Sequence, residues 1–200
     1  MQAPASTADG AGEPPPAQLF WRMAMVFFLA AAAGLMVMSQ SFGIIVAYGG
    51  ETALALFATT AITGAIAAAR LGGGWLLDRF SIPGVIMFSH GWSLAAAAPS
   101  AFSIPVSASA LAMIGMGYGF VSGSTAGAIA YYWPVSVFGR VASRLYVAWC
   151  AAALSLPVLA GHLFDLTGGY GTAMLVAGCG NLAGILVGRR LPRQERAERL

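Results

Sequence analysis

The chain has 200 residues, of which 58% are hydrophobic and only 8% are charged, and its mean hydropathy is +0.77. A soluble domain carries about a quarter of its residues as charged ones, so this chain has too few to cover a surface that faces water. Inside a bilayer the backbone must satisfy its own hydrogen bonds, and the long unbroken apolar runs favour helices over the short alternating segments of a β-barrel. We therefore predict an all-α, polytopic membrane protein.

The formal net charge of +3 comes from arginine, because the chain contains no lysine. A basic chain can bind nucleic acid, but here the arginines gather at the ends of apolar runs, as membrane topology requires. We therefore expect the lipid bilayer, and no nucleic acid, as a partner. Cys150 and Cys179 lie inside apolar runs without metal-ligand spacing, so we expect them to be packing residues and expect no metal or cofactor.

In chain order, residues 1–18 are rich in Pro, Ala, Gly and Ser and predict a disordered cytoplasmic leader. This leader does not resemble a signal peptide, because it has no basic start and carries Asp9 and Glu13. Six apolar segments then reach or approach the roughly 20 residues that cross a bilayer core. They cover residues 19–47, 52–77, 82–100, 105–131, 141–164 and 171–187. We thus expect a six-helix transmembrane domain over 19–188 and a charged cytoplasmic tail over 189–200.

The arginines also predict the orientation of the six segments. An amino terminus placed inside puts all of them except Arg70 at inner ends, while the outer turns hold Glu51 and Asp165. The opposite orientation violates the positive-inside rule at every loop. We therefore predict a multi-pass protein of the inner (cell) membrane with both termini cytoplasmic. The arginines at inner ends are Arg22, Arg79, Arg140, Arg144, Arg189, Arg190, Arg193, Arg196 and Arg199.

Small residues and one proline predict how two of the segments pack. Pro157 is expected to kink the fifth segment. Glycines in the fourth segment give it a smooth face on which another helix can lie close. These glycines are Gly115, Gly117, Gly119, Gly123 and Gly127.

Arg70 lies inside the second segment, about 12 Å from its inner end at roughly 1.5 Å per residue. An arginine within a membrane span costs roughly 2.5–3.5 kcal/mol on insertion scales, and no Asp or Glu lies within any of the six segments. An anionic ligand is thus a natural partner, since a guanidinium binds a carboxylate through two parallel hydrogen bonds. The structural alternative is that Arg70 extends toward the cytoplasmic surface or pairs with Asp78.

Several other residues are candidates for a substrate site. Thr63 shares a helical face with Arg70, and Gly73 and Gly74 leave that face open. Gln40 and Ser39 in the first segment can line a cavity or hydrogen-bond to another helix. Polar and aromatic residues of the fourth and fifth segments can shape a pocket or simply pack. They are Tyr118, Ser122, Ser124, Thr125, Tyr146 and Trp149, and we take Tyr118 and Trp149 as substrate-binding candidates.

His90 lies in the middle of the third segment, where a buried, neutral, hydrogen-bonded ring is the simpler interpretation and proton coupling the alternative. His162 lies near the outer end of the fifth segment and is expected to be interfacial.

Residues 70–79 resemble the G-x-x-x-D-R signature of the major facilitator superfamily, with Gly74, Asp78 and Arg79 at the expected spacing. The trailing glycine and basic pair of the signature are missing here. Residues 138–140 and 161–170 resemble the carboxy-terminal half of the oxalate/formate antiporter and monocarboxylate transporter group, and the leader resembles the tail of the central cytoplasmic loop. The resemblance implies one six-helix half of a transporter, with Gly74, Asp78 and Arg79 as a structural or gating motif.

In that group, an arginine eight residues before the signature aspartate contacts the substrate carboxylate, and Arg70 matches this position. Some members carry an acid one turn before this arginine, where this chain has Ile66, so the resemblance does not extend to that form of proton coupling. Oxalate exchangers use a second cation in the equivalent of the fifth segment, where this chain has Trp149-Cys150. The resemblance therefore implies a monocarboxylate rather than a dianion.

The sequence supports secondary transport, by antiport or symport, of a small organic anion, with a second six-helix half as partner, either a separate chain or another copy. Transporters of this kind rock one half against the other around a midplane site. A non-transporting or truncated membrane subunit is a second hypothesis. A rhomboid-like intramembrane protease is a third, because Ser122 and Ser124 lie in the fourth segment and His162 in the fifth, but its G-x-S-G pattern is absent. We expect a protein that is not an enzyme.

Overall fold

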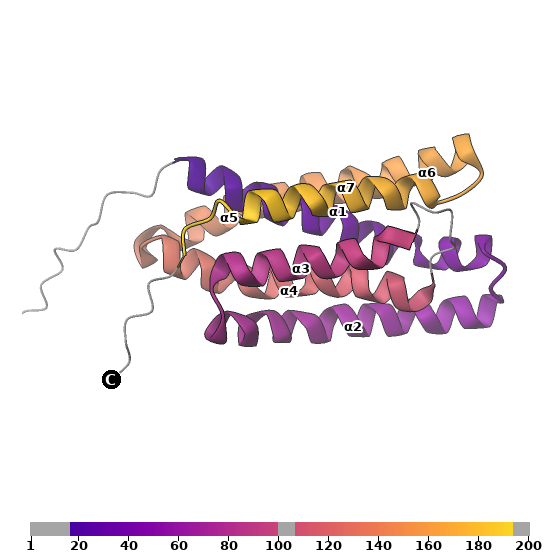
Figure 1. The fold of residues 1–200 in the computed structure, drawn as a ribbon, viewed down its shortest axis with the longest axis horizontal. Helices are drawn as coiled ribbons and strands as arrows, with labels where there is room; N and C mark the ends of the chain where they lie inside the picture. The colour runs from indigo at the N-terminus through magenta and orange to yellow at the C-terminus, as the bar shows by residue number, and fades with distance from the viewer. Residues whose placement is uncertain (1–16, 100–106, 194–200) are drawn as a thin grey trace, which may run out of the picture.

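The computed structural model describes residues 17–99 and 107–193. Within these residues the chain is helical and contains no strand, as predicted (Figure 1). Residues 1–16 of the predicted leader and residues 194–200 of the predicted tail lie outside this part, and residues 17 and 18 already belong to the first helix. The helices are α1 (Ala17–Ala47), α2 (Thr52–Arg79), α3 (Ile82–Ala97), α4 (Ala108–Tyr132), the short 3₁₀ helix η2 (Val135–Val137), α5 (Phe138–Leu154), α6 (Leu156–Thr167) and α7 (Gly171–Gly188).

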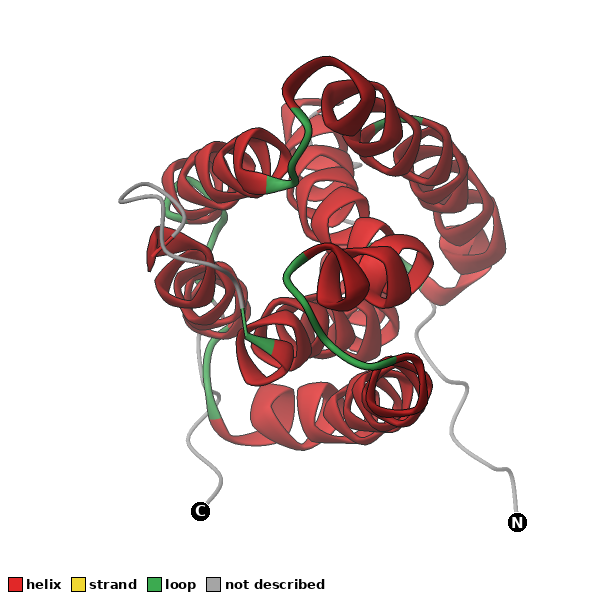
Figure 2. Ribbon diagram, turned by 90° about the vertical axis from the view of Figure 1, so that its right-hand side faces the viewer, coloured by secondary structure: helices red, strands yellow, loops and turns green. Residues whose placement is uncertain are grey.

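The helices lie side by side along one long axis, and consecutive helices run in opposite directions (Figures 1 and 2). The exception is the pair α5 and α6, which follow one another along the same pass. The predicted fifth segment is thus divided, and the division is at Ser155, whose φ of −91° and ψ of −92° are not helical. Pro157, two residues further on, lies in the first turn of α6, so the predicted kink is confirmed as a break between two helices.

Not all six passes are equally suited to a bilayer. Four described segments are long and apolar enough to cross a membrane by length and composition, which makes the chain a polytopic helical membrane protein. The pass formed by α3 has only 16 residues, fewer than the roughly 20 that cross a bilayer core, and α4 is less apolar because of its glycine, serine, threonine and tyrosine content. The predicted number of six crossings therefore remains a prediction. The four qualifying segments are Ala17–Ala47, Thr52–Arg79, Val135–Thr167 and Gly171–Gly188.

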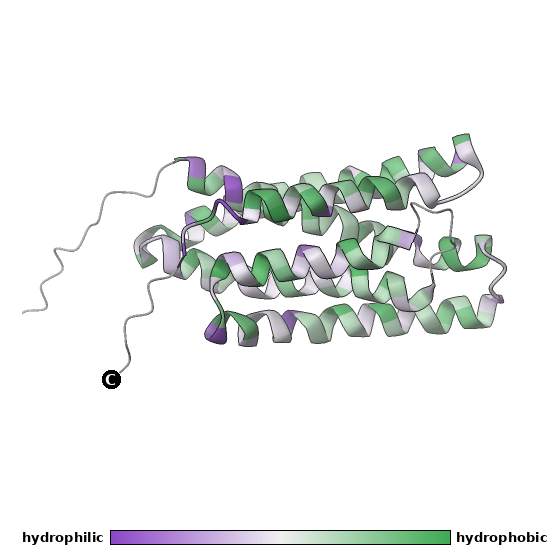
Figure 3. Cartoon of the chain, in the orientation of Figure 1, coloured by the Kyte–Doolittle hydropathy of each residue, from purple (hydrophilic) through white to green (hydrophobic). Residues whose placement is uncertain are grey.

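One end of the bundle carries most of the described arginines, and we call it the arginine end. There α1 and α5 begin and α2 and α7 end, and Figure 3 shows hydrophilic residues at this end beside helices that are mostly apolar. Arg22 of α1 donates from Nη1 to the Arg190 carbonyl at 2.8 Å, which ties the start of the first helix to the end of the last. Glu51 and Asp165 belong to the opposite end.

The glycines of α4 bring its backbone against α2, which confirms the predicted smooth face. A Cβ atom at Gly119 would meet Ala69, and one at Gly123 would meet the backbone of Arg70. Gly117 instead faces Ser89 and Ser93 of α3. The close approach matters for function, because it fixes the position along α4 that lies beside Arg70.

A polar pair joins α3 to α7 inside the bundle. His90 is 1% exposed, and its Nδ1 lies 2.9 Å from Oδ1 of Asn181, which is itself buried. Gly184 lies against the ring, where a side chain would collide with it. These contacts match the simpler interpretation of His90 as a buried, hydrogen-bonded ring.

Candidate functional site

The site begins with Arg70, which is exposed on α2 and whose side chain reaches toward α4. Its Nη2 donates a hydrogen bond to the hydroxyl of Tyr118 at 3.0 Å, and its guanidinium carbon lies 5.3 Å from the centre of the Tyr118 ring. The backbone of Arg70 lies beside Gly123. Tyr118 is five residues earlier on α4, about 7.5 Å further from the arginine end at roughly 1.5 Å per residue.

The direction of this side chain bears on the structural alternative for Arg70. Helical side chains lean toward the amino terminus of their helix, and α2 begins at the end opposite to the arginine end. The guanidinium therefore points toward the middle of the bundle rather than toward the nearer surface. Between Arg70 and Asp78 there is no ion pair among the described residues. The geometry thus does not match the structural alternative, in which Arg70 reaches the surface or pairs with Asp78.

Tyr118 is 2% exposed, and its hydroxyl oxygen also accepts a hydrogen bond from Nε1 of Trp149 at 2.8 Å. The Tyr118 ring fits because Gly34 of α1 faces it, where any side chain would overlap the ring. The Tyr118 hydroxyl therefore joins α4 to Arg70 of α2 and to Trp149 of α5. The sequence placed all three among its candidates but gave no indication of the hydrogen bonds that join them.

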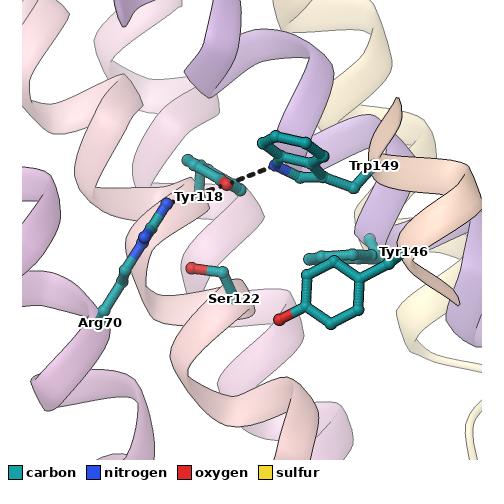
Figure 4. Close-up of a pocket in the computed structure, with 6 residues that line it drawn as sticks. Arg70, Tyr118, Ser122, Tyr146 and Trp149 are labelled. Carbon is teal, nitrogen blue, oxygen red and sulfur yellow. Dashed lines mark hydrogen bonds between the residues drawn. The ribbon is translucent and has the colours of Figure 1, made fainter. Parts of the chain in front are cut away.

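The three side chains line a cavity of about 180 Å³ (Figure 4). Figure 4 shows Arg70 on one side of it and Tyr146 and Trp149 of α5 on the other. Among the described residues of the lining, Arg70 is the only charged one, so the cavity presents one cation and a largely aromatic wall. Such a surface suits a small anion with an apolar body. The lining residues are Phe27, Arg70, Tyr118, Ser122, Tyr146 and Trp149.

Phe27 is the lining residue that the sequence analysis missed. It packs edge to face against Tyr146, with ring centres 5.9 Å apart. In the sequence it is one of several large apolar residues of the first segment, and nothing in its spacing separates it from the others. Ser122 and Tyr146, which were expected to shape a pocket, both lie in the lining.

Two predicted substrate-binding residues do not line this cavity. Thr63 is exposed on α2, and its hydroxyl donates to the carbonyl of Thr59 at 3.0 Å. Gln40 donates from Nε2 to the carbonyl of Pro157 at 3.3 Å and accepts from the hydroxyl of Tyr170 at 3.1 Å. Gln40 therefore joins α1 to the start of α6 and to the residue that precedes α7, in agreement with the helix-packing alternative.

The motif residues lie at the arginine end of α2. The guanidinium of Arg79 lies 4.0 Å from the centre of the Trp75 ring, and its Nη1 donates to the Trp75 carbonyl at 3.3 Å. Asp78 is exposed, and Gly74 faces the carbonyl of Gly123 at 4.0 Å. These contacts place the motif next to the packing of α2 on α4 and outside the cavity.

The arrangement offers little to the protease hypothesis. Ser122 donates its hydroxyl to the carbonyl of Gly119 at 3.0 Å, whereas His162 is exposed on α6. Over residues 17–99 and 107–193, no hydrogen bond joins the two, and no group of three His, Cys, Asp or Glu residues is placed to hold a metal ion.

Neither a scan against protein-family models nor a search of curated proteins finds a match for this chain. Among solved structures, it is similar to a crystal structure of a POT family transporter in complex with 5-aminolevulinic acid, with a TM-score of 0.73 and 14% sequence identity. The match covers 84% of this chain and 37% of that one, so the chain spans well under half the length of the transporter. At this identity the similarity concerns the fold, and the chain has the fold of a part of that transporter.

Proposed function

We propose that the chain forms one six-helix half of a secondary transporter of the major facilitator type, which moves a small organic anion across the inner membrane by antiport or symport. The observation that carries the proposal is the guanidinium of Arg70, which points into a cavity about midway along the bundle. The shared fold with part of a POT family transporter supports the transporter half, and it does not bear on the oxalate/formate and monocarboxylate group.

Arg70 has the chemistry for an anion. A guanidinium has five N–H donors, and one hydrogen bond, to Tyr118, is recorded for it in the described part of the chain. The remaining donors can hold a carboxylate in a bidentate pair, which is short and strong because both partners are charged. In a cavity with low dielectric constant, such a pair offsets the cost of keeping an arginine at this depth.

The lining favours one negative charge on the substrate. Its described residues include a single cation and four aromatic side chains, which can pack against the apolar part of a small ligand but cannot neutralise a second carboxylate. We therefore propose a monocarboxylate as the substrate class. Amines are less suited, because no residue that the structure describes in the lining is acidic and could pair with an ammonium group.

The proposal includes a second six-helix half, either a separate chain or another copy. The cavity opens on a side where Arg70 and Tyr146 are exposed, and a second half would close that side against lipid. The gathering of arginines at the end where α1 begins and α7 ends supports two cytoplasmic termini.

Counterflow in proteoliposomes tests the proposed function. Vesicles that contain the full chain are loaded with lactate and mixed with labelled lactate outside. We expect labelled lactate to accumulate, and we expect Arg70→Ala to abolish the accumulation, while Arg193→Ala, which removes an exposed arginine outside the cavity, leaves the accumulation within about threefold. Undiminished counterflow by Arg70→Ala would refute the assignment of Arg70.

A further inference from the structure

The hydroxyl group of Tyr118 has both of its acceptor positions filled. It accepts one hydrogen bond from Nη2 of Arg70 at 3.0 Å and one from Nε1 of Trp149 at 2.8 Å. A phenolic hydroxyl has two lone pairs and a single hydrogen, so its remaining capacity is that of a donor.

Neither partner can receive this hydrogen. The indole N–H and the guanidinium are donors only, so Tyr118 must be the acceptor in both bonds. In the part of the chain that the structure describes, no other group accepts a hydrogen bond from the Tyr118 hydroxyl. The residue is nevertheless 2% exposed, and a buried hydroxyl hydrogen without an acceptor is costly.

The unused hydrogen belongs to a group that lines the cavity together with Arg70. A carboxylate oxygen held by the guanidinium would lie next to the hydroxyl, since Nη2 and the Tyr118 oxygen are only 3.0 Å apart. A hydrogen bond to a charged oxygen is also stronger than one to a neutral acceptor.

We propose that Tyr118 is a specificity-determining residue of this site, whose O–H donates to the carboxylate oxygen that Arg70 binds. Trp149 is then a positioning residue, because its N–H occupies the second lone pair and leaves the hydroxyl hydrogen for the ligand. This inference rests on the proposed function and adds to it a second donor, on α4, and a positioning group, on α5.

In its positioning role, Trp149 acts on the carboxylate through the Tyr118 hydroxyl. Trp149→Phe keeps an aromatic ring in the lining but removes the N–H together with the five-membered ring of the indole, after which the Tyr118 hydroxyl is free to rotate. Tyr118→Phe removes the hydroxyl and keeps the ring against Gly34. The two substitutions therefore act on the same hydrogen bond to the ligand, and their effects are expected not to add.

Calorimetric titration of the full chain in lipid nanodiscs with lactate tests the inference. We expect Tyr118→Phe to weaken affinity about tenfold, Trp149→Phe about threefold, and the double variant no more than Tyr118→Phe alone. Tyr131→Phe and Trp21→Phe are matched controls, because both residues are exposed and lie outside the cavity, and they should leave affinity unchanged.

The outcomes separate the inference from the function on which it rests. If Arg70→Ala abolishes lactate binding while Tyr118→Phe binds as well as the parent chain, the role of Tyr118 is wrong and the proposed function stands. If Arg70→Ala binds normally, the proposed function itself fails. Additive losses in the double variant would show that Trp149 acts by packing, which would overturn its positioning role. Should Tyr118→Phe not fold, Trp149→Phe decides, because unchanged affinity in that variant contradicts the inference.

Discussion

Arg70 on α2 and Tyr118 on α4 are joined by a 3.0 Å hydrogen bond that turns the guanidinium toward the middle of the bundle. The contact depends on the close packing of the two helices, since Gly123 lies directly against the backbone of Arg70. The position of the cation is thus determined by a glycine on another helix as much as by its own place in the sequence.

Gly123→Ala tests this dependence. The added methyl group would overlap the backbone of Arg70, so α2 and α4 must separate, at a cost of roughly 1–3 kcal/mol in stability. We expect a lower thermal midpoint and weaker lactate binding, because the guanidinium moves away from Tyr118. Gly64→Ala, where no heavy atom lies within 4 Å of the new methyl, is the control. Equal midpoints for the two variants would contradict the packing argument.

Gln40→Leu should separate helix packing from substrate binding. Gln40 accepts from Tyr170 and donates to the carbonyl of Pro157, so its loss removes two hydrogen bonds, at about 1 kcal/mol each. We expect a lower thermal midpoint with lactate affinity unchanged, measured by melting and by calorimetry on the same preparation. A loss of affinity without a loss of stability would restore Gln40 to the substrate site. Ser39→Ala is the adjacent control, since the hydroxyl of Ser39 donates to the carbonyl of Met36 in its own helix and to no other described residue.

Asn181→Leu should destabilise the contact between α3 and α7. The substitution removes the Asn181 partner of Nδ1 of His90, a residue that is only 1% exposed. An unsatisfied buried polar group costs roughly 1–3 kcal/mol of stability. Gly184→Ala is expected to act at the same place, because its methyl would collide with the His90 ring. Gly180→Ala makes only an ordinary contact of 3.6 Å with Leu29 and serves as the control. Melting curves that coincide for all three variants would show that the polar pair is dispensable.

Cysteine labelling tests the predicted orientation. In a chain with Cys150 and Cys179 replaced by serine, a membrane-impermeant maleimide should label Glu51→Cys and Asp165→Cys on intact cells. Arg189→Cys should be labelled only after the membrane is permeabilised, because the arginine end is predicted to face the cytoplasm. Labelling of Arg189→Cys on intact cells would reverse the orientation.

The helices were predictable because their signals are local. Length and hydropathy placed each segment within a few residues, and Pro157 indicated the interruption that divides α5 from α6. Arg70 was recognisable because a cation in an apolar run is costly wherever the run lies. Each of these conclusions needed only residues that are neighbours in the sequence.

The residues that make up the site were harder to predict from the sequence, because they depend on which faces of distant helices meet. Tyr118 and Trp149 were recognisable as candidates, but the hydrogen bond between the Trp149 N–H and the Tyr118 hydroxyl depends on the rotation of α4 and α5. Gln40 is polar and lies in the first segment as a cavity residue would, yet its partners are the carbonyl of Pro157 in the first turn of α6 and the hydroxyl of Tyr170 before α7. Phe27 carried no signal, since its contact with Tyr146 exists only in the folded bundle.

The central claim is that the Arg70 guanidinium binds the carboxylate of a small monocarboxylate. Titration of the full chain in nanodiscs with lactate, and with its neutral counterpart lactamide, tests it most directly. We predict saturable binding of lactate, none of lactamide, and at least about a tenfold loss of lactate affinity in Arg70→Ala but not in Arg193→Ala. Equal lactate affinity in the parent chain and Arg70→Ala would contradict the account.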